Sequence, residues 1–113
     1  MPDRPERRSD PRVGIGVLVH EGAAGAPGAL CRAMNLSRTG MYLLRVPEKR
    51  SCRSRFAWLG FRLPDGGDSI QALVEVVHTH RLGSLEASGV RFKHLFPADR
   101  ERIEDYLSRA NAA

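Results

Sequence analysis

Two groups of polar residues in the first part of this sequence could bind a ligand that carries phosphate or guanine. The first group is an arginine pair, Arg8 and Arg12, with Arg7 directly before it. Positions four apart on an extended chain face the same side, so both guanidinium groups can converge on one ligand. Each guanidinium presents rigid N–H donors that match two phosphate oxygens, or the O6 and N7 atoms of guanine. Arginine is frequent in this chain, however, so the same spacing also arises by chance.

The second group is the segment 35–40, Asn-Leu-Ser-Arg-Thr-Gly, which has the composition of a polar turn. Asn and Ser favour turns because their side chains bond to nearby backbone groups. The amide oxygen of Asn35 can accept hydrogen bonds from the Watson–Crick edge of guanine, and Ser37 offers a hydroxyl. Gly40 is predicted to allow a positive φ and the close approach of a ligand. An ordinary turn between two strands would contain the same residues, so this motif alone leaves both interpretations open.

The alternation of apolar and polar residues predicts six strands that could position these motifs. In the first strand Val13, Ile15, Val17 and Val19 share one face, which is the period of two typical of a strand with one buried side. Turn residues at 64–68 and 81–84 separate the later strands, and the second of these turns predicts a hairpin. The predicted strands cover residues 13–20, 30–34, 41–46, 57–63, 70–80 and 85–93.

The period changes to that of a helix near the end of the chain. Pro97 lies where a helix can begin, and Asp99 and Arg109 match the helix dipole, so we predict a helix over residues 98–110. The apolar residues at helical spacings are Leu95, Phe96, Ile103, Tyr106 and Leu107.

Six short strands and one helix favour an all-β fold with a terminal helix, a six-stranded antiparallel β-barrel followed by a C-terminal α-helix. Closure of the barrel removes the exposed edges that an open sheet of this size would carry. The barrel domain would cover residues 12–113. Residues 1–11 are rich in proline and charge and predict a flexible basic arm.

Size and charge restrict the classes of function. A chain of 113 residues has room for one modest core. It contains no apolar run long enough for a membrane span, and its charged, proline-bearing start is not that of a signal peptide, so we expect a cytoplasmic protein without membrane insertion. Cys31 and Cys52 are then most simply reduced thiols. The net charge of +5 includes a basic run at 49–55, which could attract phosphate or an acidic protein surface, or simply be solvated.

No residue pattern predicts catalysis or a metal centre. No Ser/His/Asp, Cys/His or paired-carboxylate arrangement is recognisable. His78 and His80 would face the same side of a strand, but no third ligand is obvious beyond Cys31 or His94, so we expect surface histidines. The large aromatic residues are predicted to fill the core or dock the helix; these are Trp58, Phe61, Phe92, Phe96 and Tyr106.

The order of the two motifs resembles that of the PilZ domain, a bacterial receptor for the second messenger cyclic di-GMP. The segment 89–92 (Gly-Val-Arg-Phe) and the terminal helix are also similar to the end of that family, so the resemblance covers nearly the whole chain. It implies that the arginines bind phosphate and guanine edges and that the turn reads a guanine. Arg7 occupies the place of an additional arginine found where the family binds an intercalated dimer of cyclic di-GMP. The matching motif residues are Arg8, Arg12, Asn35, Ser37 and Gly40.

The resemblance further implies a non-enzymatic receptor with no cofactor besides its ligand, which signals when an ordered arm docks a downstream protein. It leaves open the identity of that protein, the ligand stoichiometry and association into a homodimer. Two departures bear on the site. Asn35 replaces the commoner Asp and so removes a charge from the guanine contact, and Pro11 constrains the arm beside Arg12 and could alter the reach of Arg8.

Two other interpretations of the sequence remain. A nucleic-acid-binding β-barrel would fit a pI near 10.0 and would use Lys49, Arg50, Arg53 and Arg55. A ligand-free adaptor with the same fold would only dock a protein.

Overall fold

The computed structural model describes residues 12–22, 29–47 and 55–112 of the chain. The predicted flexible arm at 1–11 lies outside these residues. So does most of the basic run, including Lys49, Arg50 and Arg53, together with Cys52. Within the described part of the chain, no helix combines the length and the apolar character that crossing a bilayer requires.

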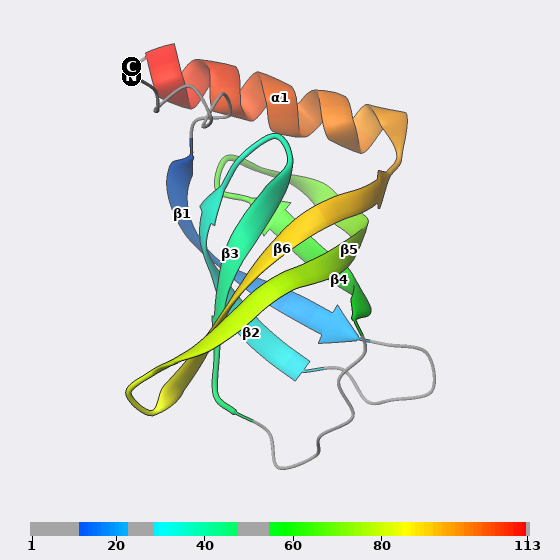
Figure 1. The fold of residues 1–113 in the computed structure, drawn as a ribbon. Helices are drawn as coiled ribbons and strands as arrows, with labels where there is room; N and C mark the ends of the chain where they lie inside the picture. The colour runs from blue at the N-terminus through cyan, green and yellow to red at the C-terminus, as the bar shows by residue number, and fades with distance from the viewer. Residues whose placement is uncertain (1–11, 23–28, 48–54, 113) are drawn as a thin grey trace, which may run out of the picture.

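The described residues form a closed barrel of six antiparallel strands with one helix across an end (Figure 1). Around the barrel the strands follow the order β1-β2-β3-β6-β5-β4, and β4 pairs with β1 to close it. The predicted fold class is therefore confirmed. The strands are β1 (Val13–Gly22), β2 (Ala29–Leu36), β3 (Gly40–Arg45), β4 (Phe56–Leu63), β5 (Gly66–Leu82) and β6 (Leu85–Leu95).

The core is filled by the side chains that the alternation placed on one face of each strand. In β1, Val19 is fully buried, and Val13, Ile15 and Val17 pack against the same core. Because one face of every strand is apolar, closing the sheet on itself removes all of these faces from water at once. The largest fully buried apolar side chains, from four strands and the helix, include Leu36, Leu43, Leu59, Ile70 and Ile103.

Helix α1 (Pro97–Ala112) covers one end of the barrel. Ile103 and Leu107 are buried in the core, and Tyr106 packs against it. On its polar side the helix is hydrogen-bonded to the turn between β4 and β5: the Arg109 guanidinium donates to the Asp65 carboxylate at 2.9 Å. The helix begins one residue earlier and ends two residues later than predicted. Leu95, which we placed at a helical spacing, is instead the last residue of β6.

The two predicted turns are shorter than the sequence suggested. Only Pro64 and Asp65 separate β4 from β5, because Gly66 and Gly67 already belong to β5. These two glycines have φ of 95° and 89°. Between β5 and β6 the chain reverses over two residues, with Gly83 at φ 60°. A two-residue reversal with a left-handed residue matches the twist of the flanking strands, so the predicted hairpin is confirmed.

The prediction that the large aromatic residues fill the core or dock the helix is right for three and wrong for two of them. Phe61 is buried, and Phe92 and Tyr106 pack against the core. Trp58 and Phe96, however, are 44% and 54% exposed. Trp58 alternates with buried Ala57 and Leu59, so strand geometry points it outward whatever its hydrophobicity.

Candidate ligand-binding site

The turn between β2 and β3 is held by the hydroxyl of Ser37. Its Oγ accepts hydrogen bonds from the backbone N–H groups of Thr39 and Gly40, both at 3.2 Å. The backbone N–H of Ser37 donates to the Gly40 carbonyl at 2.9 Å, and the Phe92 N–H of β6 donates to the Thr39 carbonyl at 2.7 Å. Ser37 is 6% exposed. The hydroxyl therefore builds the turn, and its predicted contact with a ligand stays a prediction.

Gly40 is required by the neighbouring strand rather than by its own backbone conformation. Its φ is not positive, which corrects our expectation for this residue. A Cβ atom added to Gly40 would overlap the carbonyl oxygen of Val90 and lie 3.1 Å from the Cα of Arg91. Only glycine allows β3 and β6 to approach this closely.

The strand register brings the start of β1 beside the predicted turn. Val13 is paired with Leu36, and Gly14 is paired with Asn35. Arg12, directly before this pair, is exposed and forms no ion pair within the described residues. Asn35 is half-buried, and no hydrogen bond among the described residues uses its side chain. Arg12 and Asn35 are far apart in the sequence, and the fold places both at one end of the β1–β2 ladder.

Arg7 and Arg8 lie outside the described residues, so the structure places neither. It does add two cationic residues that sequence reasoning did not single out. Arg38 is exposed within the turn itself, and Arg91 is exposed on β6, where it is paired with Gly40. The sequence did contain a signal for Arg91, because it stands between the apolar residues Val90 and Phe92. Neighbouring residues of a strand face opposite sides, so Arg91 is expected on the outer face.

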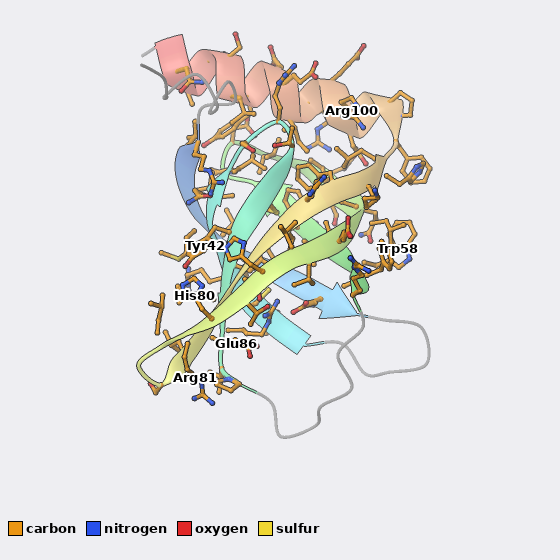
Figure 2. All side chains as sticks on the ribbon, in the orientation of Figure 1. Tyr42, Trp58, His80, Arg81, Glu86 and Arg100 are labelled. Atoms are coloured by element: carbon orange, nitrogen blue, oxygen red, sulfur yellow. The ribbon has the colours of Figure 1, made fainter. Side chains whose placement is uncertain are left out.

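Tyr42 is a further residue that the sequence did not mark. It is paired with Asn35 across β2 and β3, and its buried neighbours Met41 and Leu43 show that it points outward. Its hydroxyl bonds to Nε2 of His80 at 3.0 Å. Figure 2 shows Tyr42 and His80 together on one flank of the barrel, with Trp58 on the opposite flank.

His78 and His80 face the same side of β5, as predicted, and their rings stack with centroids 5.9 Å apart. Of the two ligands that could have joined them, Cys31 is buried in the core and His94 contacts Trp58 and Phe96. Among the residues that the structure describes, no group of three or more His, Cys, Asp or Glu side chains is arranged to hold a metal ion.

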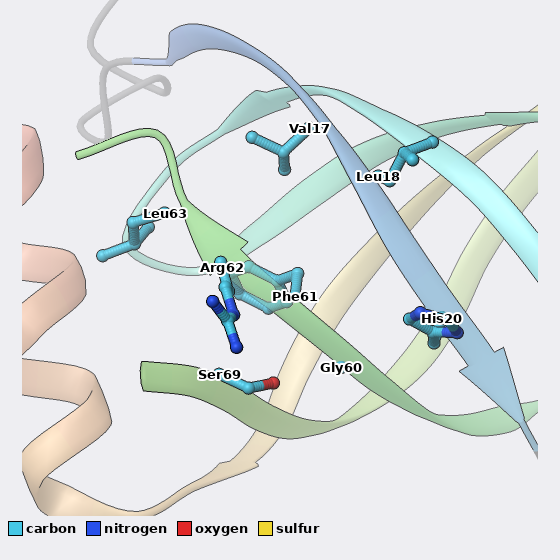
Figure 3. Close-up of a pocket in the computed structure, with 8 residues that line it drawn as sticks. All are labelled: Val17, Leu18, His20, Gly60, Phe61, Arg62, Leu63 and Ser69. Carbon is cyan, nitrogen blue, oxygen red and sulfur yellow. The ribbon is translucent and has the colours of Figure 1, made fainter. Parts of the chain in front are cut away.

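An open pocket of about 560 Å³ lies on a different part of the barrel wall (Figure 3). It forms because β1 pairs with β4 only from Val19 to Gly22, so the preceding part of β1 separates from β4. Its lining includes Val17, Leu18 and Arg62, and none of the predicted site residues. The pocket is therefore separate from the surface between Arg12 and the turn.

A group of charged side chains surrounds Arg45, at the opposite end of the barrel from the turn between β2 and β3. Arg45 contacts Glu21 at 2.9 Å and Glu86 at 3.3 Å, with all three side chains less than 20% exposed. Arg45 also donates to the buried Ser88 hydroxyl at 2.8 Å. Near this group, burial and the charge of Glu21 raise the pKa of the Cys31 thiol to about 12. Every one of these polar contacts is within the protein, which favours a structural role.

Comparison with known proteins agrees with the family suggested by the motifs. The family model of the PilZ domain matches residues 4–109. No curated protein matches the chain. Similar solved structures include the Bacillus subtilis inhibitor of motility MotI/DgrA, with a TM-score of 0.79 and 17% identity over 99% of this chain and 57% of that chain.

Two other similar solved structures contain cyclic di-GMP. The PilZ domain of Escherichia coli YcgR with c-di-GMP has a TM-score of 0.75 and 12% identity over 94% of this chain and 92% of that chain. The K. pneumonia MrkH–c-di-GMP complex has a TM-score of 0.65 and 23% identity over 89% of this chain and 51% of that chain. The chain thus spans little more than half of MotI/DgrA and MrkH. The TM-scores show a shared fold, and the PilZ family model matches residues 4–109, so this chain belongs to the PilZ domain family.

Proposed function

We propose that this protein is a receptor for cyclic di-GMP, which binds between the N-terminal arginines and the turn after β2. The observation that carries the proposal is the register of β1 and β2, in which Arg12 precedes the Val13–Leu36 pair and so lies at the same end of the ladder as Asn35. YcgR and MrkH, whose solved structures contain c-di-GMP, share the fold. Arg7 and Arg8 precede Arg12 by five and four positions, so each lies within about 20 Å of it along the chain.

The residues of the site would have separate roles. Arg7, Arg8 and Arg12 supply guanidinium groups for the phosphates and for the O6 and N7 atoms of guanine. Asn35 offers an amide oxygen and an amide N–H₂ to the Watson–Crick edge of the base. Ser37 and Gly40 would hold the turn at its position against β6, and the Ser37 hydroxyl, which already bonds to Thr39 and to the Gly40 carbonyl within the turn, would have to exchange one of these partners to donate to the ligand.

Signalling would follow from folding of the arm over the bound ligand. Two phosphates draw the three arginines onto the barrel, and the free energy of binding supplies the cost of ordering the arm. The surface formed in this way would recognise a downstream protein. Domains of this family are binding modules rather than enzymes, and we propose the same for this chain, acting in the cytoplasm where a second messenger is sensed.

Calorimetric titration with cyclic di-GMP, with GTP as the control nucleotide, tests this function. We expect Arg8→Ala and Arg12→Ala each to weaken binding by about 10- to 100-fold, because each removes charge-assisted hydrogen bonds. Arg62→Ala, which removes an exposed arginine beside the separate pocket, is the matched control and should bind as the wild type does.

The other interpretations give different outcomes in the same experiment. A nucleic-acid-binding barrel would prefer RNA or DNA, and its affinity would fall linearly with the logarithm of salt concentration. A ligand-free adaptor would bind neither nucleotide. Absence of cyclic di-GMP binding at micromolar concentration, or unchanged affinity in both arginine variants, would refute the proposed site.

A further inference from the structure

The outer face of β4, β5 and β6 carries exposed aromatic side chains, on the flank of the barrel opposite to Tyr42 (Figure 2). Trp58 of β4 and His94 of β6 are both paired with Leu73 of β5, the strand between them. Phe96 follows directly after β6, where the chain enters α1. The exposed aromatic residues of this surface are Phe56, Trp58, His94 and Phe96, which we call the aromatic face.

Three rings of the aromatic face hold one another in place. The centroids of Trp58 and His94 are 6.4 Å apart with 75° between the ring planes, and those of His94 and Phe96 are 5.3 Å apart with 78°. The strand alternation explains why these side chains point outward, but it does not require them to be aromatic. A group of large exposed apolar side chains marks a binding surface, and ordered rings lose little side-chain freedom when a partner binds.

Cationic side chains border the aromatic face. Arg55 and Lys93 each directly precede one of the aromatic residues in the chain, and Arg100 lies at the start of α1, where its backbone N–H donates to the Phe96 carbonyl at 2.9 Å. All three cationic side chains are exposed. The carboxylate of Glu75 lies among them, but Arg55 contacts it at 3.1 Å and Lys93 at 3.8 Å. Two cations therefore share one anion, and the border of the face keeps a positive charge.

Aromatic rings and cations on the outer face of a sheet suit a single-stranded nucleic acid. The bases of a single strand are free to stack on aromatic side chains, and sheet-based modules bind RNA in this way. The phosphates of the strand pair with Lys and Arg side chains. A duplex would satisfy only the cations, because its bases are already stacked inside the helix. The net charge of +5 also favours an anionic partner.

We propose that the aromatic face binds single-stranded nucleic acid, with bases stacked on Trp58 and Phe96 and phosphates held by the bordering cations. This inference goes beyond the proposed function, because the face lies outside the cyclic di-GMP site and takes a different ligand. It also differs from the nucleic-acid-binding interpretation of the sequence, which assigned the contacts to the basic run. A protein with both sites would bind the messenger and the strand on separate flanks.

The fluorescence of Trp58 reports directly on this surface, because it is the only tryptophan of the chain. Titration with an oligouridylate of about 12 nucleotides, a length within the range that one small barrel binds, should quench the emission as a base stacks on the indole. Oligothymidylate of the same length distinguishes RNA from DNA as the strand preferred. A duplex of the same sequence length should leave the emission unchanged. Unchanged emission with both single strands would overturn the inference.

Fluorescence anisotropy of a labelled oligouridylate measures the affinity of variants at the aromatic face. We expect Trp58→Ala and Phe96→Ala each to weaken binding by about 5- to 140-fold, the range for loss of one base-stacking ring. Both side chains are exposed, so both variants should keep the thermal melt of the wild type. Leu82→Ala removes a comparably exposed apolar side chain at the β5–β6 hairpin and is the matched control. Equal affinity of all three variants would refute stacking on this face.

The cations have their own test in the salt dependence of binding. Lys93→Gln and Arg100→Gln should each reduce the slope of log affinity against log salt by about 0.7, the value for one phosphate contact with a single strand. Arg81→Gln, at the tip of the β5–β6 hairpin and away from Trp58 in Figure 2, should leave the slope unchanged. Poly-L-glutamate carries charge without bases. If it competes as well as unlabelled oligouridylate at equal charge, the face binds acidic protein segments and the inference is overturned.

The inference and the proposed function fail separately. Arg12→Ala should bind oligouridylate as the wild type does while it loses affinity for cyclic di-GMP. If Arg12→Ala lost both ligands, the strand would occupy the messenger site and the inference would be overturned. A wild type that binds cyclic di-GMP but neither single strand refutes the inference alone. A wild type that binds oligouridylate through Trp58 but no cyclic di-GMP refutes the receptor function and supports the inference.

Discussion

Replacement of Gly40 by alanine tests whether the turn glycine serves the barrel or the ligand. The new Cβ atom would overlap the carbonyl oxygen of Val90 and lie 3.0 Å from the Val90 carbonyl carbon and 3.1 Å from the Cα of Arg91. All three atoms belong to the backbone of β6, which is paired with β3 on one side and β5 on the other. Relief of the clash therefore disturbs two ladders at once.

The expected cost follows from this geometry. Overpacking a well-packed site costs about 1–3 kcal/mol, and the rigid obstacle puts Gly40→Ala at the upper end, about 3 kcal/mol. For a domain of this size, that loss lowers the melting temperature by roughly 12–24 °C. Thermal unfolding followed by circular dichroism measures it. Gly14→Ala is the matched control, because its nearest neighbour is the Met34 carbonyl oxygen at 3.9 Å and its φ is not positive.

Two results would decide the matter. A melting temperature for Gly40→Ala close to that of Gly14→Ala would show that the glycine is not needed for strand packing. If that variant also lost cyclic di-GMP binding, Gly40 would instead be required for close approach of the ligand, as the sequence first suggested.

Three further predictions concern buried polar groups. Ser37→Ala should lower the free energy of unfolding by about 1–3 kcal/mol, because the N–H groups of Thr39 and Gly40 lose their acceptor. Urea unfolding measures this loss. Ser84 is exposed, so Ser84→Ala is the control and should change the free energy of unfolding little. Arg45→Met should cost about 3 kcal/mol, because it removes the cation that contacts the largely buried carboxylate of Glu21 and the acceptor partners of its other N–H groups, and a variant that melts like wild type would contradict this. In a Cys52→Ser background, the Cys31 thiol should resist iodoacetamide at pH 8 until urea unfolds the protein, since burial raises its pKa from 9.0 to about 12. The raised pKa also means that the stabilisation of the neutral thiol is complete below pH 9 and is lost as the pH rises toward 12, which unfolding at several pH values would detect.

Local patterns were sufficient to predict the elements of this barrel. The alternation in β1 gave its inward face, and the glycine at 83 gave the hairpin, because strand facing and turn geometry depend on a few neighbouring residues. The outward position of Trp58 was contained in the same alternation. The prediction that it was buried failed because it weighed the hydrophobicity of the side chain above its place in the strand.

The spacing of Asn35, Ser37 and Gly40 in the sequence predicted a polar turn and suggested the family. The reason for a glycine at position 40 was not visible there, because the atoms that exclude a side chain come from β6, about fifty residues later in the chain. Contacts between distant segments depend on strand order and register, which no single segment specifies.

The same limit applies to the surface that we assign to the ligand. The sequence by itself determined the strands, the helix and the two motifs, since each follows from residues close together in the chain. Only the tertiary structure decided that Arg12 and Asn35 lie at the same end of the β1–β2 ladder and that the Tyr42 hydroxyl bonds to His80, because the order β1-β2-β3-β6-β5-β4 is set when all the apolar faces are buried together.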